Sequence, residues 1–135
     1  MLDKMISLAR DAMGRAYAPY SNFQVGAVMR GVGGDLFSGC NVENAAYPQG
    51  CCAEASAISA MIMAGEKRIA EVVVMGRGEG LVTPCGGCRQ RIREFADDST
   101  PIHVCDEEGL RKTVTLGELL PLSFGPENLE PKNKG

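Results

Sequence analysis

Cysteines are the most constraining feature of this sequence, because four of the six fall in two tight clusters. One cluster is the pair Cys51 and Cys52, and the other is Cys85 with Cys88 three residues later. The N-terminal residues mix charged with apolar side chains, unlike a secretory signal peptide, so we expect a cytoplasmic protein. Clustered cysteines in a reducing compartment more often bind a metal than form disulfides. The fold is therefore expected to bring two distant segments to one ion.

Length and charge limit the possible architectures and partners. A chain of 135 residues has room for one domain, since separate cores usually appear only above roughly 250 residues. Hydrophobic residues make up 44% and charged residues 23%, as in ordinary globular proteins. No apolar run is long enough for a transmembrane helix. The net charge of -3 is opposite to the basic surface that neutralises phosphates. We expect neither a membrane nor a nucleic acid as partner.

The pattern of apolar residues predicts alternating helices and strands. Spacings of three and four predict helices over 2–15, 52–64, 89–95 and 116–120. Short apolar or alternating runs predict strands over 23–29, 35–40, 69–76, 101–105 and 112–114. The run Val72-Val73-Val74-Met75 is apolar on both faces, which is typical of a central strand. We therefore expect one α/β domain over 1–125, with helices on the faces of a sheet, and a flexible tail over 126–135.

The number of protein ligands distinguishes a catalytic zinc site from a structural one. Three protein ligands leave a position open for water, whereas four close the site. Cys85 and Cys88 can face one ion from the first turn of a helix, and Cys52 begins another predicted helix. Two helix N-termini at one ion would lower the thiol pKa values. Glu54 lies two residues past Cys52, close enough to reach a zinc-bound water without binding the metal.

The combined pattern is that of the zinc deaminases. Those enzymes carry a His or Cys, one residue and then Glu, followed later by Pro-Cys-x-x-Cys. Here the two parts are Cys52-Ala53-Glu54 and Pro84-Cys85-Gly86-Gly87-Cys88. Zinc lowers the pKa of a bound water from 15.7 to about 7. Glu54 would be placed to take a proton from that water and to return it later, as a general acid and base.

Over nearly its whole length the sequence resembles the small homo-oligomeric cytidine deaminases. The matching segments are 17–27, 39–47, 88–90 and 118–121, with Phe124. The resemblance implies a three-layer α/β/α sandwich with a five-stranded mixed sheet, and a homotetramer with one zinc per subunit. It also implies hydrolytic deamination of cytidine and 2′-deoxycytidine to uridine and 2′-deoxyuridine, a step of pyrimidine salvage.

The same resemblance assigns roles to individual residues. Asn41 and Glu43 would hold the ribose hydroxyls, Phe23 would stack on the pyrimidine, and the backbone at Ala53 would meet the base carbonyl. A neighbouring subunit's site would be closed by Ala46, Tyr47 and Phe124. Glu54 would be the catalytic residue, and the metal ligands would be Cys52, Cys85 and Cys88.

Simpler explanations remain open for each part of the pattern. Cys85 and Cys88 could form a redox dithiol or half of a structural zinc site. Glu54 could be a first-turn carboxylate favoured by the helix dipole, and the polar residues of 41–44 could serve a turn. The corresponding alternative functions are deamination of another cytosine nucleoside, such as an antibiotic, deamination of a polynucleotide, or a zinc-stabilised binding module.

One position departs from the family pattern. Many three-cysteine relatives have Arg directly after the catalytic Glu, where this chain has Ala55. Three thiolates on one zinc leave a formal charge of -1, which the helix dipoles and a nearby cation would have to offset. Arg89 is the expected cation. Cys51 could compete for the metal, but Cys52 gives the correct spacing to Glu54. His103 is the only histidine, so a histidine-rich zinc site is excluded.

Overall fold

In a computed structural model, residues 1–129 are described, and the predicted order of helices and strands is confirmed. The elements are α1 Leu2–Gly14, β1 Val25–Gly31, β2 Leu36–Cys40, η1 Tyr47–Gln49, α2 Ala53–Met63, β3 Ile69–Gly76, α3 Gly86–Arg93, β4 Pro101–Asp106, β5 Gly109–Thr115, α4 Leu116–Leu119 and η2 Pro126–Asn128. The predicted strand 69–76 agrees to the residue, while other bounds shift by a few residues.

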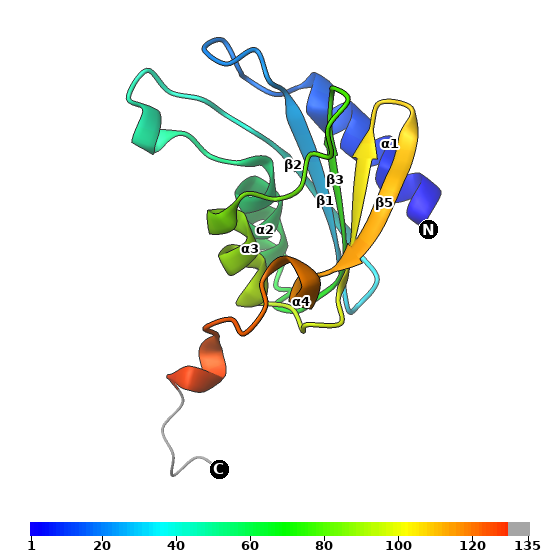
Figure 1. The fold of residues 1–135 in the computed structure, drawn as a ribbon, viewed down its shortest axis with the longest axis vertical. Coiled ribbons are helices and arrows are strands. Elements are labelled where there is room, and N and C mark those ends of the chain that lie inside the picture. Colours follow the sequence, from blue (N-terminus) through cyan, green and yellow to red (C-terminus); the bar gives the residue numbers. More distant parts are fainter. Residues whose placement is uncertain (130–135) are drawn as a thin grey trace.

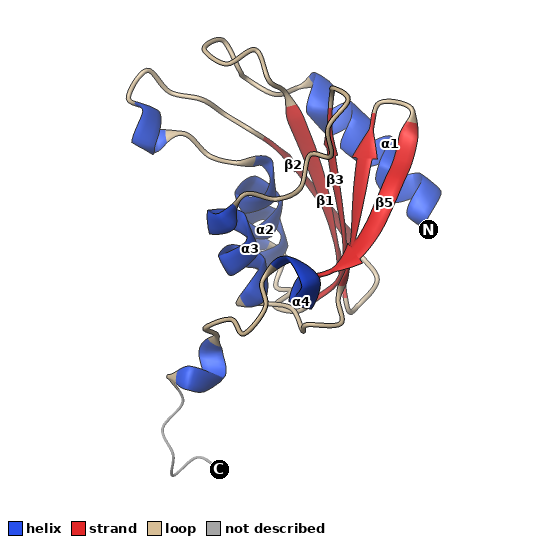
Figure 2. Ribbon diagram, viewed as in Figure 1, coloured by secondary structure: helices blue, strands red, loops and turns tan. Residues whose placement is uncertain are grey.

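The five strands form one mixed sheet in the order β2-β1-β3-β4-β5 (Figure 2). Strands β3 and β4 run parallel, and the remaining neighbours are antiparallel. The parallel pair requires a crossover connection, which α3 supplies. Strand β3 lies at the centre, and its residues 72–75 are fully buried. The mixed five-stranded sheet expected from the resemblance is confirmed.

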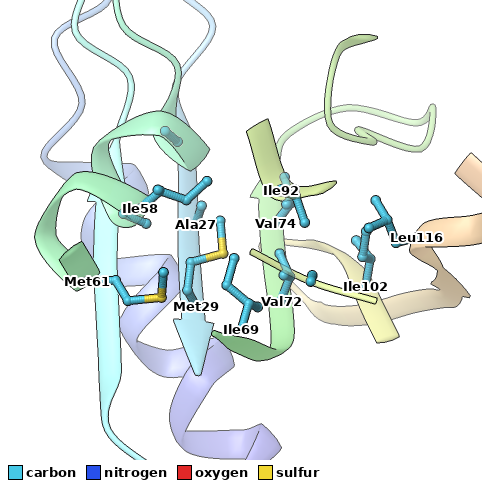
Figure 3. Close-up of a cluster of buried hydrophobic side chains, with 13 residues drawn as sticks. Ala27, Met29, Ile58, Met61, Ile69, Val72, Val74, Ile92, Ile102 and Leu116 are labelled. Atoms are coloured by element: carbon cyan, nitrogen blue, oxygen red, sulfur yellow. The ribbon is translucent and has the colours of Figure 1, made fainter. Parts of the chain in front are cut away.

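Helices cover both faces of this sheet (Figure 1). Because side chains alternate along a strand, β3 contributes to two separate cores. Val73 and Met75 pack with Met5 and Met13 of α1. Val72 and Val74 pack on the opposite face, in the cluster shown in Figure 3, with residues of α2, α3 and α4. The fold is thus the expected three-layer α/β/α sandwich.

A glycine on β2 determines how closely α2 approaches the sheet. A Cβ atom at Gly39 would lie 2.4 Å from the backbone nitrogen of Ala57 and 2.7 Å from the carbonyl oxygen of Ala53. Only a residue without a side chain allows this approach. The first turn of α2, which follows Cys52, is therefore fixed directly against β2.

The C-terminal part ends in a short 3-10 helix. The predicted tail begins with η2, and its residues 130–135 lie outside the described part of the chain. Within residues 1–129, none of the helices has the length and apolar character that crossing a membrane requires.

Candidate metal centre and active site

The structure brings together the three cysteines singled out by the sequence. Cys52 is the N-cap of α2, Cys85 is the N-cap of α3, and Cys88 lies in the first turn of α3. Their sulfur atoms all lie within 4.8 Å of one another. Tetrahedral zinc with Zn–S bonds of about 2.3 Å needs sulfurs about 3.8 Å apart, so small side-chain adjustments suffice. Three sulfur donors suit zinc, because zinc is among the metals that soft thiolate ligands select.

Other candidate ligands lie elsewhere. Cys51 is exposed, and its backbone exchanges hydrogen bonds with Val42. His103 on β4 is buried, with its Nδ1 2.8 Å from the Thr113 hydroxyl and its Nε2 2.5 Å from a Glu71 carboxylate oxygen. Neither residue belongs to the sulfur cluster, which agrees with the choice of Cys52 made from the spacing.

The thiols have different electrostatic environments. Burial raises the pKa of Cys52 and of Cys88 above the ordinary value. A hydrogen bond from the backbone N–H of Cys88 lowers the pKa of Cys85. Without the metal, desolvation thus opposes ionisation of Cys52 and Cys88, while the first turn of α3 favours the thiolate of Cys85.

Glu54 lies in the first turn of α2 and is only 4% exposed. Burial raises the pKa of its carboxyl group, although the Cys88 thiol and the positive charge of Arg91 act in the opposite direction. A carboxyl group with a raised pKa can both accept and return a proton near neutral pH. A surface first-turn carboxylate would lack this property.

Arg91 is the arginine that touches the sulfur cluster. Its Nη1 lies 3.6 Å from the Cys88 sulfur. The guanidinium of Arg89 instead donates hydrogen bonds to the Pro84 carbonyl, the Leu119 carbonyl and the Thr83 hydroxyl. Arg89, the cation expected from the sequence, thus uses its hydrogen bonds on the loop before Cys85 and on the end of α4, and its contribution to the thiolate charge stays a prediction.

The two residues expected to hold ribose tie two loops together in this structure. The Asn41 side chain accepts a hydrogen bond from Val25 N–H at 2.8 Å and donates one to the Phe23 carbonyl at 2.9 Å. The Glu43 carboxylate accepts hydrogen bonds from the N–H groups of Tyr20 and Ser21. The Ser21 hydroxyl also donates to it and lowers its pKa. Glu43 is therefore a carboxylate held in a fixed orientation.

A hollow of about 360 Å³ opens beside these residues, lined by Tyr20, Ser21, Glu43, Asn44, Tyr47 and Gly50. The rings of Tyr20 and Tyr47 meet edge to face, with centroids 6.0 Å apart. The volume is in the range of small-molecule sites. Gly50, which lines the hollow, is only two residues before Cys52, the N-cap of α2. The chain therefore passes directly from the hollow to the sulfur cluster.

The remaining predicted site residues divide between buried and exposed positions. Ala53 is buried at the first position of α2, where the backbone N–H has no acceptor within the helix. Phe23 is 42% exposed, Phe124 is 57% exposed and Tyr47 is 75% exposed. Ala46 is exposed as well. Three aromatic rings of the predicted site are thus exposed in this chain.

Comparison with known proteins decides the family. Residues 1–104 match the family described as "Cytidine and deoxycytidylate deaminase zinc-binding region". The chain belongs to this deaminase family. A cytidine deaminase of Sporosarcina psychrophila is 38% identical over 128 residues, covering 95% of this chain and 94% of the relative.

Solved structures of family members share the fold. The cytidine deaminase of Burkholderia pseudomallei superimposes with a TM-score of 0.86 at 37% identity, covering 92% of this chain and 99% of that one. The cytidine deaminase of Mycobacterium tuberculosis gives a TM-score of 0.78 at 33% identity, covering 91% and 96%. As a member of this deaminase family the chain is a zinc-binding hydrolase.

Sequence reasoning missed two residues that shape the deaminase site. Ser21 fixes the Glu43 carboxylate, and no motif marks it as a partner. Arg91 stands three residues after Cys88, a spacing that places two side chains on one face of a helix. That spacing could have identified Arg91 from the sequence.

Proposed function

We propose that the protein catalyses the hydrolytic deamination of cytidine and 2′-deoxycytidine, releasing ammonia and forming uridine and 2′-deoxyuridine. One observation carries the proposal: three sulfurs from two helix N-termini converge, with the buried Glu54 carboxyl in the same first turn of α2 as Cys52. Zinc bound by Cys52, Cys85 and Cys88 would leave a position for water and supply the nucleophile at neutral pH.

Glu54 moves the protons in this reaction. Its carboxylate takes a proton from the attacking water and delivers it to the ring nitrogen beside C4, which makes C4 electrophilic. The oxygen of the water adds to C4. Glu54 then takes the proton of this new C4 hydroxyl and delivers it to the exocyclic amine, so that the C4–N bond breaks, ammonia leaves and the C4 carbonyl of the uracil forms. The raised pKa of Glu54 supports both transfers, because it brings the carboxyl group closer to neutral pH.

Four residues of the same subunit orient the nucleoside in this proposal. Asn41 and Glu43 bind the ribose hydroxyls, and the fixed Glu43 carboxylate beside the 360 Å³ hollow supports this role. Phe23 stacks on the pyrimidine, with Asn41 holding its backbone carbonyl. The free N–H of Ala53 at the start of α2 donates to the base carbonyl.

We further propose a homotetramer with one zinc per subunit, in which neighbours complete each site. The exposed Ala46, Tyr47 and Phe124 would cover the nucleoside of an adjacent subunit. Large exposed aromatic rings are enriched at protein interfaces, which supports this arrangement. A cytoplasmic location in pyrimidine salvage fits as well, because all six cysteines are free thiols in the described residues.

The test compares the zinc-loaded protein with its Glu54→Gln variant. We expect the parent to convert cytidine and 2′-deoxycytidine, followed by the change in ultraviolet absorbance and by ammonia release. Glu54→Gln should keep its zinc and lose about 10²- to 10⁴-fold of the rate, the usual contribution of a general acid and base. Glu108→Gln changes an exposed carboxylate by the same chemistry and should retain full activity.

Two results would contradict the proposal. If the zinc-loaded parent turned over neither nucleoside, the protein would be a zinc-stabilised binding module or a deaminase of another cytosine compound. If Glu54→Gln kept the parent rate, Glu54 would be a structural carboxylate.

A further inference from the structure

The proposed zinc site has an unbalanced charge. Three thiolates and one Zn²⁺ carry a formal charge of -1, and Ala55 supplies no positive charge beside them. We propose that Arg91, on α3, is the positioning residue that offsets this charge through its contact with Cys88, in place of an arginine at position 55. The inference rests on zinc binding by the three cysteines, and it concerns a residue outside the two cysteine motifs.

The geometry of α3 directs Arg91 to the sulfur. Residues three apart lie on one face of a helix, with the later side chain directed back toward the N-terminus. Arg91 Nη1 accordingly lies 3.6 Å from Cys88 Sγ. A Cβ atom at Gly87 would stand 3.1 Å from the same Nη1. The missing side chain at Gly87 therefore leaves room for the guanidinium over the first turn of α3.

The other nearby arginine is already committed to other partners. Arg89 uses its Nε, Nη1 and Nη2 on the Pro84 carbonyl, the Leu119 carbonyl and the Thr83 hydroxyl, at 2.7, 2.8 and 3.0 Å. Arg91, in contrast, forms no ion pair with a carboxylate among residues 1–129. Its charge is thus available to the sulfur cluster.

Arg91 and Ala55 face the same space from opposite helices. A hollow of about 370 Å³ between α2 and α3 is lined by Ala55, Ile58, Ser59, Gln90, Arg91, Glu94 and Phe95. The small Ala55 leaves this space open on the α2 side, and Arg91 lines it on the α3 side. An arginine introduced at position 55 would have room in the same hollow, which makes a second-site rescue possible.

The effect on metal binding follows from charge balance. Zinc binding replaces thiol protons and creates the negatively charged cluster, so a cation beside the cluster stabilises the loaded site. A hydrogen bond to a thiolate also lowers the energy of the sulfur electrons, and losing it shifts a sulfur-to-metal charge-transfer band to longer wavelength. Residues that touch metal ligands typically change metal affinity by 10- to 100-fold when they are mutated.

The test measures metal binding and not turnover, so it is independent of the proposed reaction. The full-length protein, Arg91→Met, Arg91→Lys and the double variant Arg91→Met with Ala55→Arg are titrated with zinc against a chromophoric chelator. Each is also loaded with cobalt and its absorption spectrum recorded. Arg68→Met serves as the control, because it removes an exposed, ion-paired arginine before β3.

We expect Arg91→Met to weaken zinc binding by about 10- to 100-fold and to shift the cobalt charge-transfer band to longer wavelength. Arg91→Lys and the double variant should recover most of both effects, and Arg68→Met should resemble the parent. Arg91 is exposed, so these variants are expected to fold. Unchanged affinity and spectrum in Arg91→Met would overturn the proposal. A loss that neither Lys nor the second-site Arg recovers would also overturn it, because Arg91 would then act by packing.

Discussion

Two consecutive cysteines with different surroundings show how much a single position matters. Cys52 caps α2 and lies within the sulfur cluster, whereas Cys51 is exposed and pairs through its backbone with Val42. The two side chains differ in nothing but their position, so they form a matched pair for mutation.

We expect Cys52→Ser to lose stoichiometric zinc and Cys51→Ser to keep it. A serine hydroxyl is a far poorer zinc ligand than a thiolate, and two remaining sulfurs make a weak site. Zinc content after dialysis, measured by atomic absorption, distinguishes the variants. Equal zinc in both would mean that Cys51 takes over when Cys52 is absent, and loss in Cys51→Ser would show that the ligand is misassigned.

The ligands could be predicted from the sequence because their spacing encodes the metal geometry. Cys85 and Cys88 fit one helical turn, and Glu54 follows Cys52 at the deaminase spacing. The arginine that offsets the negative charge of the three thiolates could not be identified from spacing in the same way. Arg89 is nearer to the cysteines in the chain than Arg91 and has the same chemistry, but its guanidinium donates hydrogen bonds to the carbonyls of Pro84 and Leu119. The three-dimensional positions of the Pro84 and Leu119 carbonyls decide where the Arg89 side chain lies, and the sequence does not reveal these positions.

At the scale of elements, the site depends on two helix N-termini held at one place. Helix α3 crosses between the parallel strands β3 and β4, and α2 rests on β2 at Gly39. The central strand was predictable to the residue, because its apolar run is buried on both faces. The edge strand β5 was predicted too short at its start, since Gly109 and the exposed Arg111 give no apolar pattern.

We expect Gly39→Ala to push α2 away from β2 and to weaken zinc binding. Its Cβ would collide with backbone atoms of α2, which cannot move as a side chain can. Overpacking of this kind costs about 1–3 kcal/mol of unfolding free energy. Thermal unfolding and zinc titration measure the two effects. Gly14→Ala is the matched control, because nothing lies within 4 Å of a Cβ atom there. Equal behaviour of the two variants would show that α2 does not depend on this contact.

For the molecule as a whole, the exposed aromatic rings bear on the proposed assembly, in which a neighbouring subunit completes each site. Tyr47 and Phe124 are exposed, and no periodicity in the sequence distinguishes them from ordinary loop residues. Their role was inferred from the family resemblance alone. The association of subunits and the sharing of sites between them could therefore not be derived from the sequence by physical reasoning.

Mixing two inactive variants tests whether neighbouring subunits share sites. We expect Glu54→Gln and Phe124→Ala to be impaired separately, and hybrids formed by unfolding and refolding them together to recover up to about a quarter of the parent rate in a symmetric assembly. Recovery arises because some sites combine an intact Glu54 with a neighbour's intact Phe124. A mixture no more active than its separate components would show that each subunit's site is self-contained.

The most direct test of the account is the coordination of the bound metal. X-ray absorption at the zinc edge of the full-length protein should give three sulfur neighbours at about 2.3 Å and one oxygen at about 2.0 Å. That result means a site open to water beside Glu54. Four sulfur neighbours would mean a closed structural site, and fewer than three would mean that Cys52, Cys85 and Cys88 do not hold the ion together; either would contradict the account.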